Sequence, residues 1–175
     1  MNLKAFIQMA LTVSVFTTAH AEDKQVSGKT FIFTLPEQVE SKPPDNSDVY
    51  VFQWKSGIGT ANFVISTTRL ASNQERLHQY ADELKKELEK GFMKDKMFKI
   101  RPKPNKDIEL GAFKGVVVEF QLESNSDVEL WYHQFILSDG IHTLFAPITA
   151  HSEKDYDQAC QIIKHAKRRV KTEKP

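Results

Sequence analysis

The chain has a single cysteine, Cys160, among its 175 residues. An intramolecular disulfide is therefore excluded, and stability has to come from the burial of apolar side chains. An excess of charge of one sign is also missing, because 24 basic residues stand against 23 acidic ones and the formal net charge is +1. A nearly neutral chain is not attracted as a whole to polyanions, so we expect no nucleic-acid partner.

Long apolar runs are scarce as well. Residues 5–16 are largely apolar, but the stretch is too short to span a bilayer comfortably. It follows Lys4 and precedes Ala19-His20-Ala21, which together form the pattern of a cleaved secretory signal peptide. We expect a signal peptide over residues 1–21 and one soluble domain over residues 22–175, either periplasmic or secreted. Because no cysteine lies near the cleavage site, the pattern excludes a bacterial lipid anchor.

Hydrophobic periodicity predicts an α+β fold, with a mainly antiparallel sheet flanked by helices. Runs rich in aromatic and β-branched residues predict strands over residues 30–35, 49–54, 60–68, 97–101, 116–122, 128–137 and 141–149. Two helices complete the order. The first begins at a capping box of Ser72 and Glu75 and ends at Gly91. The second begins at Ser152, and its apolar stripe runs to Val170.

Three predictions concern the turns and the burial of the later strands. Gly111 and Gly115 are expected to flank a turn. In residues 116–122, strict alternation predicts one buried face and one mostly solvated face, which leaves Glu119 and Glu123 in water. Asp139-Gly140 predicts a two-residue hairpin turn, which pairs Leu137 with His142 and His133 with Ala146.

A resemblance is carried by the capped first helix and by five short sequences, at residues 31–37, 110–115, 139–144, 146–147 and 162–163. Together these features resemble the PsbP-like family, which includes the DcrB-like exported bacterial proteins. The resemblance implies an α/β/α sandwich and non-enzymatic work as an accessory subunit, adaptor or chaperone, with no shared catalytic residues. The chain departs from the family at Gln38 and Val39, where members often have an aromatic residue, and in lacking a lipobox cysteine.

Candidate catalytic and metal-binding residues are few. The histidines lack the short spacing of zinc sites, and the predicted register puts His133 and His142 about 13 Å apart. His151 is left as a candidate that would need a distant carboxylate. Cys160 lies on an apolar stripe, and His165 is turned about 140° away round the helix, so the thiol has no base. No Gly-x-Ser-x-Gly elbow occurs, and Ser138 belongs to a turn. We therefore predict no catalytic residues, no metal ligands and no cofactor.

The strongest binding feature is a basic segment that contains Pro102 and Pro104 and is predicted to be a loop. It contains Lys94, Lys96, Lys99, Arg101, Lys103 and Lys106. Such a loop can bind an acidic patch on a protein or anionic lipid headgroups, and the alternative is a solvated loop that balances the acidic helix. Trp54 and the solvated face of strand 116–122 form a second candidate surface, for which core packing of Trp54 is the alternative.

These observations predict a non-enzymatic exported protein that binds another envelope protein, as an adaptor, accessory or chaperone-like factor. Two alternatives stay open. A small periplasmic hydrolase or metal-dependent enzyme would show a deep pocket lined by convergent histidine and carboxylate groups. An immunity-type protein that neutralises a secreted toxin would look the same in sequence.

Overall fold

The computed structural model describes residues 24–42, 49–56, 59–69, 73–94, 98–124 and 129–169. The predicted signal peptide lies outside these residues. The elements, in chain order, are β1 (Lys24–Ser27), β2 (Phe31–Leu35), β3 (Glu40–Lys42), β4 (Val49–Ser56), β5 (Gly59–Thr68), α2 (Gln74–Lys94), β6 (Phe98–Pro102), β7 (Lys106–Leu110), β8 (Phe113–Ser124), β9 (Glu129–Ser138), β10 (Thr143–Ala150), α3 (Glu153–Lys164) and β11 (Lys167–Arg168).

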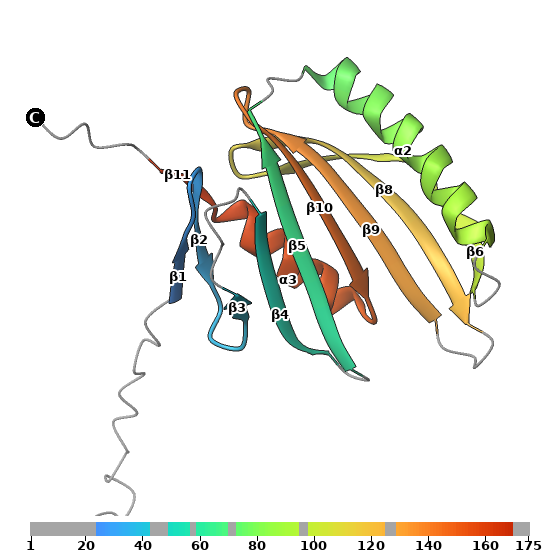
Figure 1. The fold of residues 1–175 in the computed structure, drawn as a ribbon, viewed down its shortest axis with the longest axis horizontal. Coiled ribbons are helices and arrows are strands. Elements are labelled where there is room, and N and C mark those ends of the chain that lie inside the picture. The colour runs from blue at the N-terminus through green and yellow to red at the C-terminus, as the bar shows by residue number, and fades with distance from the viewer. Residues whose placement is uncertain are drawn as a thin grey trace, which may run out of the picture.

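The strands form one large sheet and one small sheet (Figure 1). The large sheet has eight strands in the order β3-β4-β5-β10-β9-β8-β6, and β7 also pairs with β8. The small sheet has the order β1-β2-β11. The strand pairs are antiparallel in both sheets. The α+β class with a mainly antiparallel sheet is therefore confirmed, whereas the sandwich of the PsbP-like kind stays a prediction.

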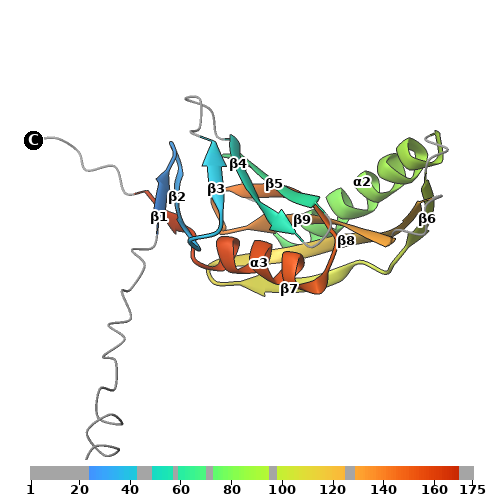
Figure 2. The ribbon, with the colours of Figure 1, turned by 90° about the horizontal axis from the view of Figure 1, so that it is seen from below.

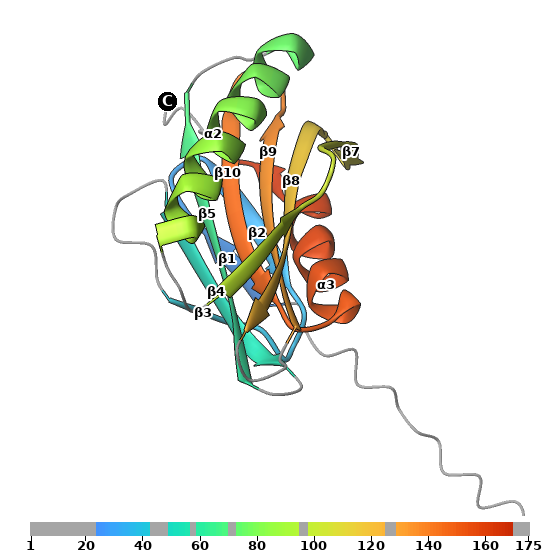
Figure 3. The ribbon, with the colours of Figure 1, turned by 90° about the vertical axis from the view of Figure 1, so that its right-hand side faces the viewer.

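The two helices cover opposite faces of the large sheet (Figure 3). Leu77 and Ala81 of α2 pack with Val116 and Val118 of β8. Buried residues of α3 pack instead with Val117 of the same strand. Because neighbouring strand residues point to opposite faces, β8 is covered on both sides along much of its length. The predicted solvated face of residues 116–122 is therefore wrong: Val117 is 1% exposed and Glu119 is 5% exposed.

Both helix boundaries differ from those predicted. At the start of α2, the Arg76 amide donates to Asn73 Oδ1 at 2.9 Å, so Asn73 is the N-cap, and Ser72 lies outside the described residues. Gly91 does not end α2, which continues to Lys94. A glycine ends a helix when it adopts a left-handed conformation, and the positive φ angles belong to Gly111 and Gly140.

The last helix is shorter than its apolar stripe predicts. It ends at Lys164, and Lys167 and Arg168 then pair with Ile32 and Phe31 of β2. The edge of β2 offers unpaired backbone groups, and this tertiary pairing overrides the local helical pattern. The predicted continuation of this helix toward Val170 is therefore wrong for Lys167 and Arg168, and Val170 itself lies outside the described residues.

The β9–β10 hairpin also differs from its predicted register, because Leu137 pairs with Leu144 and His133 with Ile148. The turn has four residues, 139–142, rather than two. Asp139 Oδ1 accepts hydrogen bonds from the amides of Ile141 and His142 at 2.9 and 2.7 Å. Since the register differs by two residues, each side chain keeps its predicted face.

The turn between β7 and β8 was expected to lie between two glycines. Gly111 lies in the turn, with φ at 62°. Gly115 lies inside β8 instead, and a Cβ there would overlap the backbone carbonyl of Ile136 on β9. In the described part of the chain, neither helix is long and apolar enough to cross a membrane.

Candidate functional site

The basic segment lies at an edge of the large sheet. The short strand predicted over residues 97–101 is present as β6, whereas the prediction of a loop is wrong for Lys106, which begins β7. β6 pairs with residues 120–124 of β8, and β7 pairs with residues 113–117. Residues 103–105 therefore stand opposite only residues 118 and 119, which makes a one-residue β-bulge. Pro102 and Pro104 fit here, because edge strands and bulges are where a sheet tolerates proline.

The first helix holds the bulge in place. Lys85 Nζ of α2 donates to the carbonyl of Lys103 at 2.6 Å, and Asn105 Nδ2 donates to Asp82 Oδ1 at 2.9 Å. The Lys103 amide donates in turn to the carbonyl of Glu119 on β8 at 3.0 Å. The bulge is thus bonded on two sides, and its backbone is a defined part of the fold.

The bulge decides which way the cations face. Before it, Lys99 and Arg101 pair with Glu123 and Gln121, whose side chains share the α3 side of the sheet with Glu119. The extra residue shifts the alternation, so Lys106 pairs with Val117 and lies on that same side. We call this surface the mixed-charge face. It comprises Lys99, Arg101, Lys103, Lys106, Glu119, Gln121, Glu123, Trp131 and His133.

Two of the four cations of the mixed-charge face are paired with carboxylates. Arg101 Nη2 lies 2.6 Å from Glu123 Oε1, and Lys106 Nζ lies 2.7 Å from Glu119 Oε2. Lys103 Nζ instead lies 5.6 Å from the centre of the Trp131 ring. Within the described residues, neither Lys99 nor Lys103 has an ion-pair partner. Of the other two predicted cations, Lys94 is the last residue of α2 and Lys96 lies outside the described residues.

A row of rings leads from this face toward the core. The Trp131 and His133 rings are 6.2 Å apart and stacked, and the His133 and Tyr156 rings are 4.6 Å apart. Tyr156 belongs to α3, and Figure 2 shows that α3 stops short of the end of the sheet where β6 lies. The outer part of the mixed-charge face is therefore left uncovered, and its inner part is closed by α3.

Glu119 is the buried acid of this face. Its Oε1 lies 3.3 Å from His133 Nδ1, and its other oxygen is held by Lys106. Burial raises the pKa of Glu119, but His133 and Lys106 outweigh it and leave this pKa below its ordinary value. Glu119 is thus a structural anion, contrary to the prediction that it is solvated.

Among the described residues, a second cluster, around Asp155, is the one that most resembles a hydrolase site. Asp155 accepts from Trp54 Nε1 at 2.8 Å, Ser56 Oγ at 2.6 Å, Ser152 Oγ at 3.0 Å and the His151 amide at 3.1 Å. It borders a cavity of about 740 Å³ that His151 also lines. In a catalytic triad the imidazole accepts the serine proton. Here both hydroxyls donate to the carboxylate itself, so neither is activated by His151.

The Asp155 cluster instead joins β4 to α3. Burial raises the pKa of Asp155, but the bonds from Ser56, Trp54, Ser152 and the His151 amide outweigh it, and this pKa lies below its ordinary value. Trp54 lies in the core, so the alternative of core packing holds and Trp54 is no surface for a partner. In the sequence, Asp155 is one of two acids near the start of the last helix, and nothing local indicates its bonds to β4.

Cys160 is partly buried against the core beside Tyr156. Burial raises the pKa of its thiol to about 11. A thiol with this pKa stays protonated near neutrality, and only the thiolate is a nucleophile. His165 Nδ1 lies 2.9 Å from the Gln161 carbonyl, so it is engaged within its own helix. Among the described residues, no group of three or more histidine, cysteine or acidic side chains is arranged to hold a metal ion.

Comparison with protein-family models and with curated proteins finds no match. Several solved structures match this fold, among them LpqN and a protein from Bacteroides thetaiotaomicron. LpqN, described as involved in cell envelope biogenesis of Mycobacterium tuberculosis, has a TM-score of 0.53 and 11% identity over 83% of this chain and 89% of its own. A protein from Bacteroides thetaiotaomicron has a TM-score of 0.52 and 17% identity over 85% of this chain. This chain spans about half of the Bacteroides protein, 51% of its length.

These identities show a shared fold alone. They carry no residue role to this chain, and the membership of the PsbP-like family stays a prediction.

Proposed function

We propose that this protein is an exported, non-enzymatic adaptor or accessory factor of the cell envelope. It binds an acidic patch on a partner protein through the mixed-charge face. The observation that carries the proposal is the uncovered end of the sheet, where Lys99 and Lys103 flank Trp131 and lack carboxylate partners among the described residues. The description of LpqN as an envelope biogenesis protein supports the setting.

The chemistry of this surface suits an acidic protein patch. Cations on a strand edge sit on a backbone that is already ordered, so binding costs less conformational entropy than it would on a free loop. Trp131 is half-buried and provides an aromatic anchor of the kind that often dominates binding energy. The Arg101 side chain is 63% exposed, so a partner carboxylate can compete for it with Glu123.

The experiment compares three proteins as bait in an envelope fraction. They are the wild type, the triple variant Lys99→Ser/Arg101→Ser/Lys103→Ser, and a control triple variant, Lys55→Ser/Lys86→Ser/Lys154→Ser, that removes as much charge elsewhere. We expect a captured protein that the control retains and the first variant loses. Association measured with that partner should slow and lose its salt dependence in the first variant only.

The same variants must remain folded. Exposed charges contribute little to stability, so the free energy of unfolding should change by less than about 1 kcal/mol in either triple variant. An unchanged association rate at low salt overturns the proposal, and the interface then lies on another face.

Export is tested separately. The intact mass of the protein recovered outside the cytoplasm should equal that of a chain that begins at Glu22. A protein that retains Met1 contradicts the predicted localisation.

A further inference from the structure

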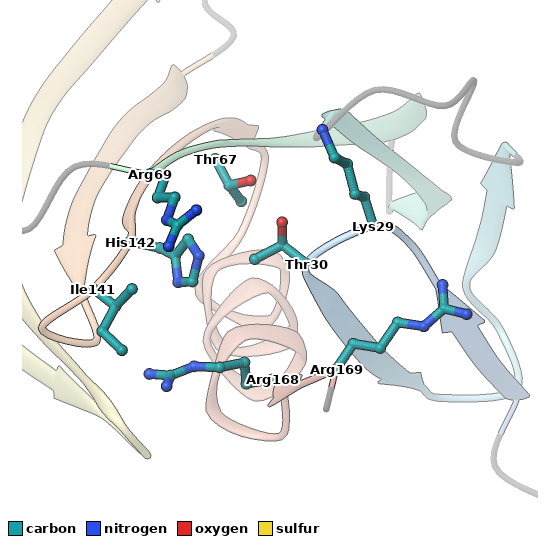
Figure 4. A pocket seen from close by; sticks show the side chains of 8 residues that line it. All are labelled: Lys29, Thr30, Thr67, Arg69, Ile141, His142, Arg168 and Arg169. Carbon is teal, nitrogen blue, oxygen red and sulfur yellow. The ribbon is translucent and has the colours of Figure 1, made fainter. Parts of the chain in front are cut away.

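A cationic cleft lies at the opposite end of the large sheet, where the small sheet meets the β9–β10 loop (Figure 4). Its volume is about 390 Å³. Four of its eight lining residues are cations and none is a carboxylate: Lys29, Thr30, Thr67, Arg69, Ile141, His142, Arg168 and Arg169. Figure 4 shows Arg69, Ile141 and His142 on one side, with Lys29 and Arg169 on the other and Thr30 between them.

Four distant segments build this cleft. Lys29 and Thr30 lie in the turn between β1 and β2, and Thr67 and Arg69 lie at the end of β5. The β9–β10 loop and the chain at β11 complete it. Backbone pairing holds the segments together, because β11 adds to β2 and the Arg169 amide donates to the Thr30 carbonyl at 2.9 Å.

The floor of the cleft is rigid. The hydroxyl of Tyr50 accepts a hydrogen bond from the Phe31 amide at 3.1 Å. A Cβ at Gly28 would overlap the Tyr50 ring, so the β1–β2 turn lies directly against that ring. The Phe31 ring meets the His142 ring edge-on at 5.4 Å. The β1–β2 turn, which carries Lys29, and the β9–β10 loop, which carries Ile141 and His142, therefore rest on one aromatic support.

The positive charge of the cleft is only partly compensated. Asp139, which lies beside it, accepts from Arg168 Nη2 at 2.9 Å, and its side chain is 4% exposed. Arg169 Nη1 donates to the Gly28 carbonyl at 3.0 Å, which fixes the guanidinium without cancelling its charge. Within the described part of the chain, Arg69 has no ion-pair partner. Of the three arginines, Arg168 alone pairs with a carboxylate of the described residues.

We propose that this cleft binds a phosphate ester group. Guanidinium groups present paired donors that match phosphate oxygens, and charge-assisted bonds of this kind are the strong ones. The volume lies within the range of small-molecule sites and accommodates a ligand larger than a bare ion. Ile141, at the rim, is 43% exposed and offers an apolar contact to the carbon part of the ester. The ester is either a soluble phosphomonoester or the headgroup of an anionic phospholipid.

The test uses two probes and one matched pair of variants. Glycerol 3-phosphate represents the soluble ester, and vesicles of phosphatidylglycerol, compared with vesicles of phosphatidylcholine, represent the membrane. Arg69→Gln removes a cleft cation that forms no ion pair with the described residues, and Lys86→Gln removes an exposed charge from α2. Amide chemical shifts report the soluble ligand and co-sedimentation reports the vesicles, in each case on the mature protein at constant ionic strength.

We expect Arg69→Gln to weaken binding about tenfold, as the loss of one charge-assisted bond predicts, and Lys86→Gln to change it little. Shifts at residues 29–30, 67–69 and 141–142 with glycerol 3-phosphate assign a soluble ester. Binding that is seen only with phosphatidylglycerol, and is reduced by Arg69→Gln and by Ile141→Ser, assigns a lipid headgroup. The proposal is overturned if neither probe binds, or if the two charge variants weaken binding equally.

Discussion

The two ends of β9 differ in how many of their cations are paired with carboxylates. Trp131, at one end, belongs to the mixed-charge face, and Ser138, about 23 Å along the strand, adjoins the cationic cleft. At the first end, Arg101 and Lys106 form ion pairs with Glu123 and Glu119 of β8, the strand that pairs with both edge strands. At the second end, Arg168 pairs with Asp139, whereas the described residues provide no carboxylate for Arg69 or Arg169. Ion pairs within the fold therefore hold two of the four cations of the mixed-charge face, but one of the three arginines of the cleft.

Both ends depend on one scaffold, and the largest expected effect is the loss of its central polar contact. Asp155→Ala should lower the free energy of unfolding by about 3 kcal/mol, because it leaves the buried Trp54 Nε1 without an acceptor and frees α3 from β4. Urea denaturation measures this change. Asp157→Ala, on the exposed side of the same helix, is the control and should cost less than about 0.5 kcal/mol. A loss below about 1 kcal/mol for Asp155→Ala would mean that α3 is held by apolar packing alone.

The next effect sharpens the comparison at the mixed-charge face. Glu119→Gln should cost about 2 kcal/mol, because Lys106 and His133 lose the buried anion between them. Glu123→Gln removes the more exposed carboxylate of the same strand face and should cost about 0.5 kcal/mol. Equal changes in the free energy of unfolding for the two substitutions would show that the burial of Glu119 adds nothing to the stability that it provides.

The mixed-charge face could be predicted only in part. Its cations are contiguous in sequence, so they were found as a group. The bulge at residues 103–105 was not foreseen, and two prolines suggested a loop because nothing local reveals that this segment pairs with β8. Without the bulge, strict alternation would place Lys103 and Lys106 on opposite faces. The burial of Glu119 depends on α3, which packs on that face from a distant part of the chain.

The cationic cleft was missed altogether. Its residues come from four segments, and of these only the last, at residues 167–169, is a run of cations in the sequence. Its assembly depends on two features that local sequence patterns do not predict. One is the early end of α3, which releases Arg168 and Arg169 to the edge of β2. The other is the four-residue β9–β10 turn, in which Asp139 organises the loop and also binds Arg168.

Acid should weaken the scaffold through its depressed carboxylates. The pKa values of Glu119 and Asp155 lie below their ordinary values of 4.5 and 3.8. Their stabilising effect is therefore fully present above those ordinary values and is lost as the pH falls through the lower pKa values of the folded protein. The free energy of unfolding, measured as a function of pH, should fall less steeply in Glu119→Gln than in the wild type. Parallel profiles would contradict a depressed pKa at Glu119.

The smallest expected effect tests the comparison of the two ends most directly, because the two substitutions should change the free energy of unfolding in opposite directions. Arg69 lies in a cluster of cations and has no ion-pair partner among the described residues, so Arg69→Gln should raise the free energy of unfolding at low salt by up to about 0.5 kcal/mol. Arg101→Gln breaks the contact with Glu123 and should lower it by a similar amount. Both differences should shrink as sodium chloride is added, since the Debye length falls to about 3 Å at 1 M salt. If Arg69→Gln instead lowers stability by more than about 1 kcal/mol, its guanidinium is structural. The two ends of β9 would then use charge in the same way.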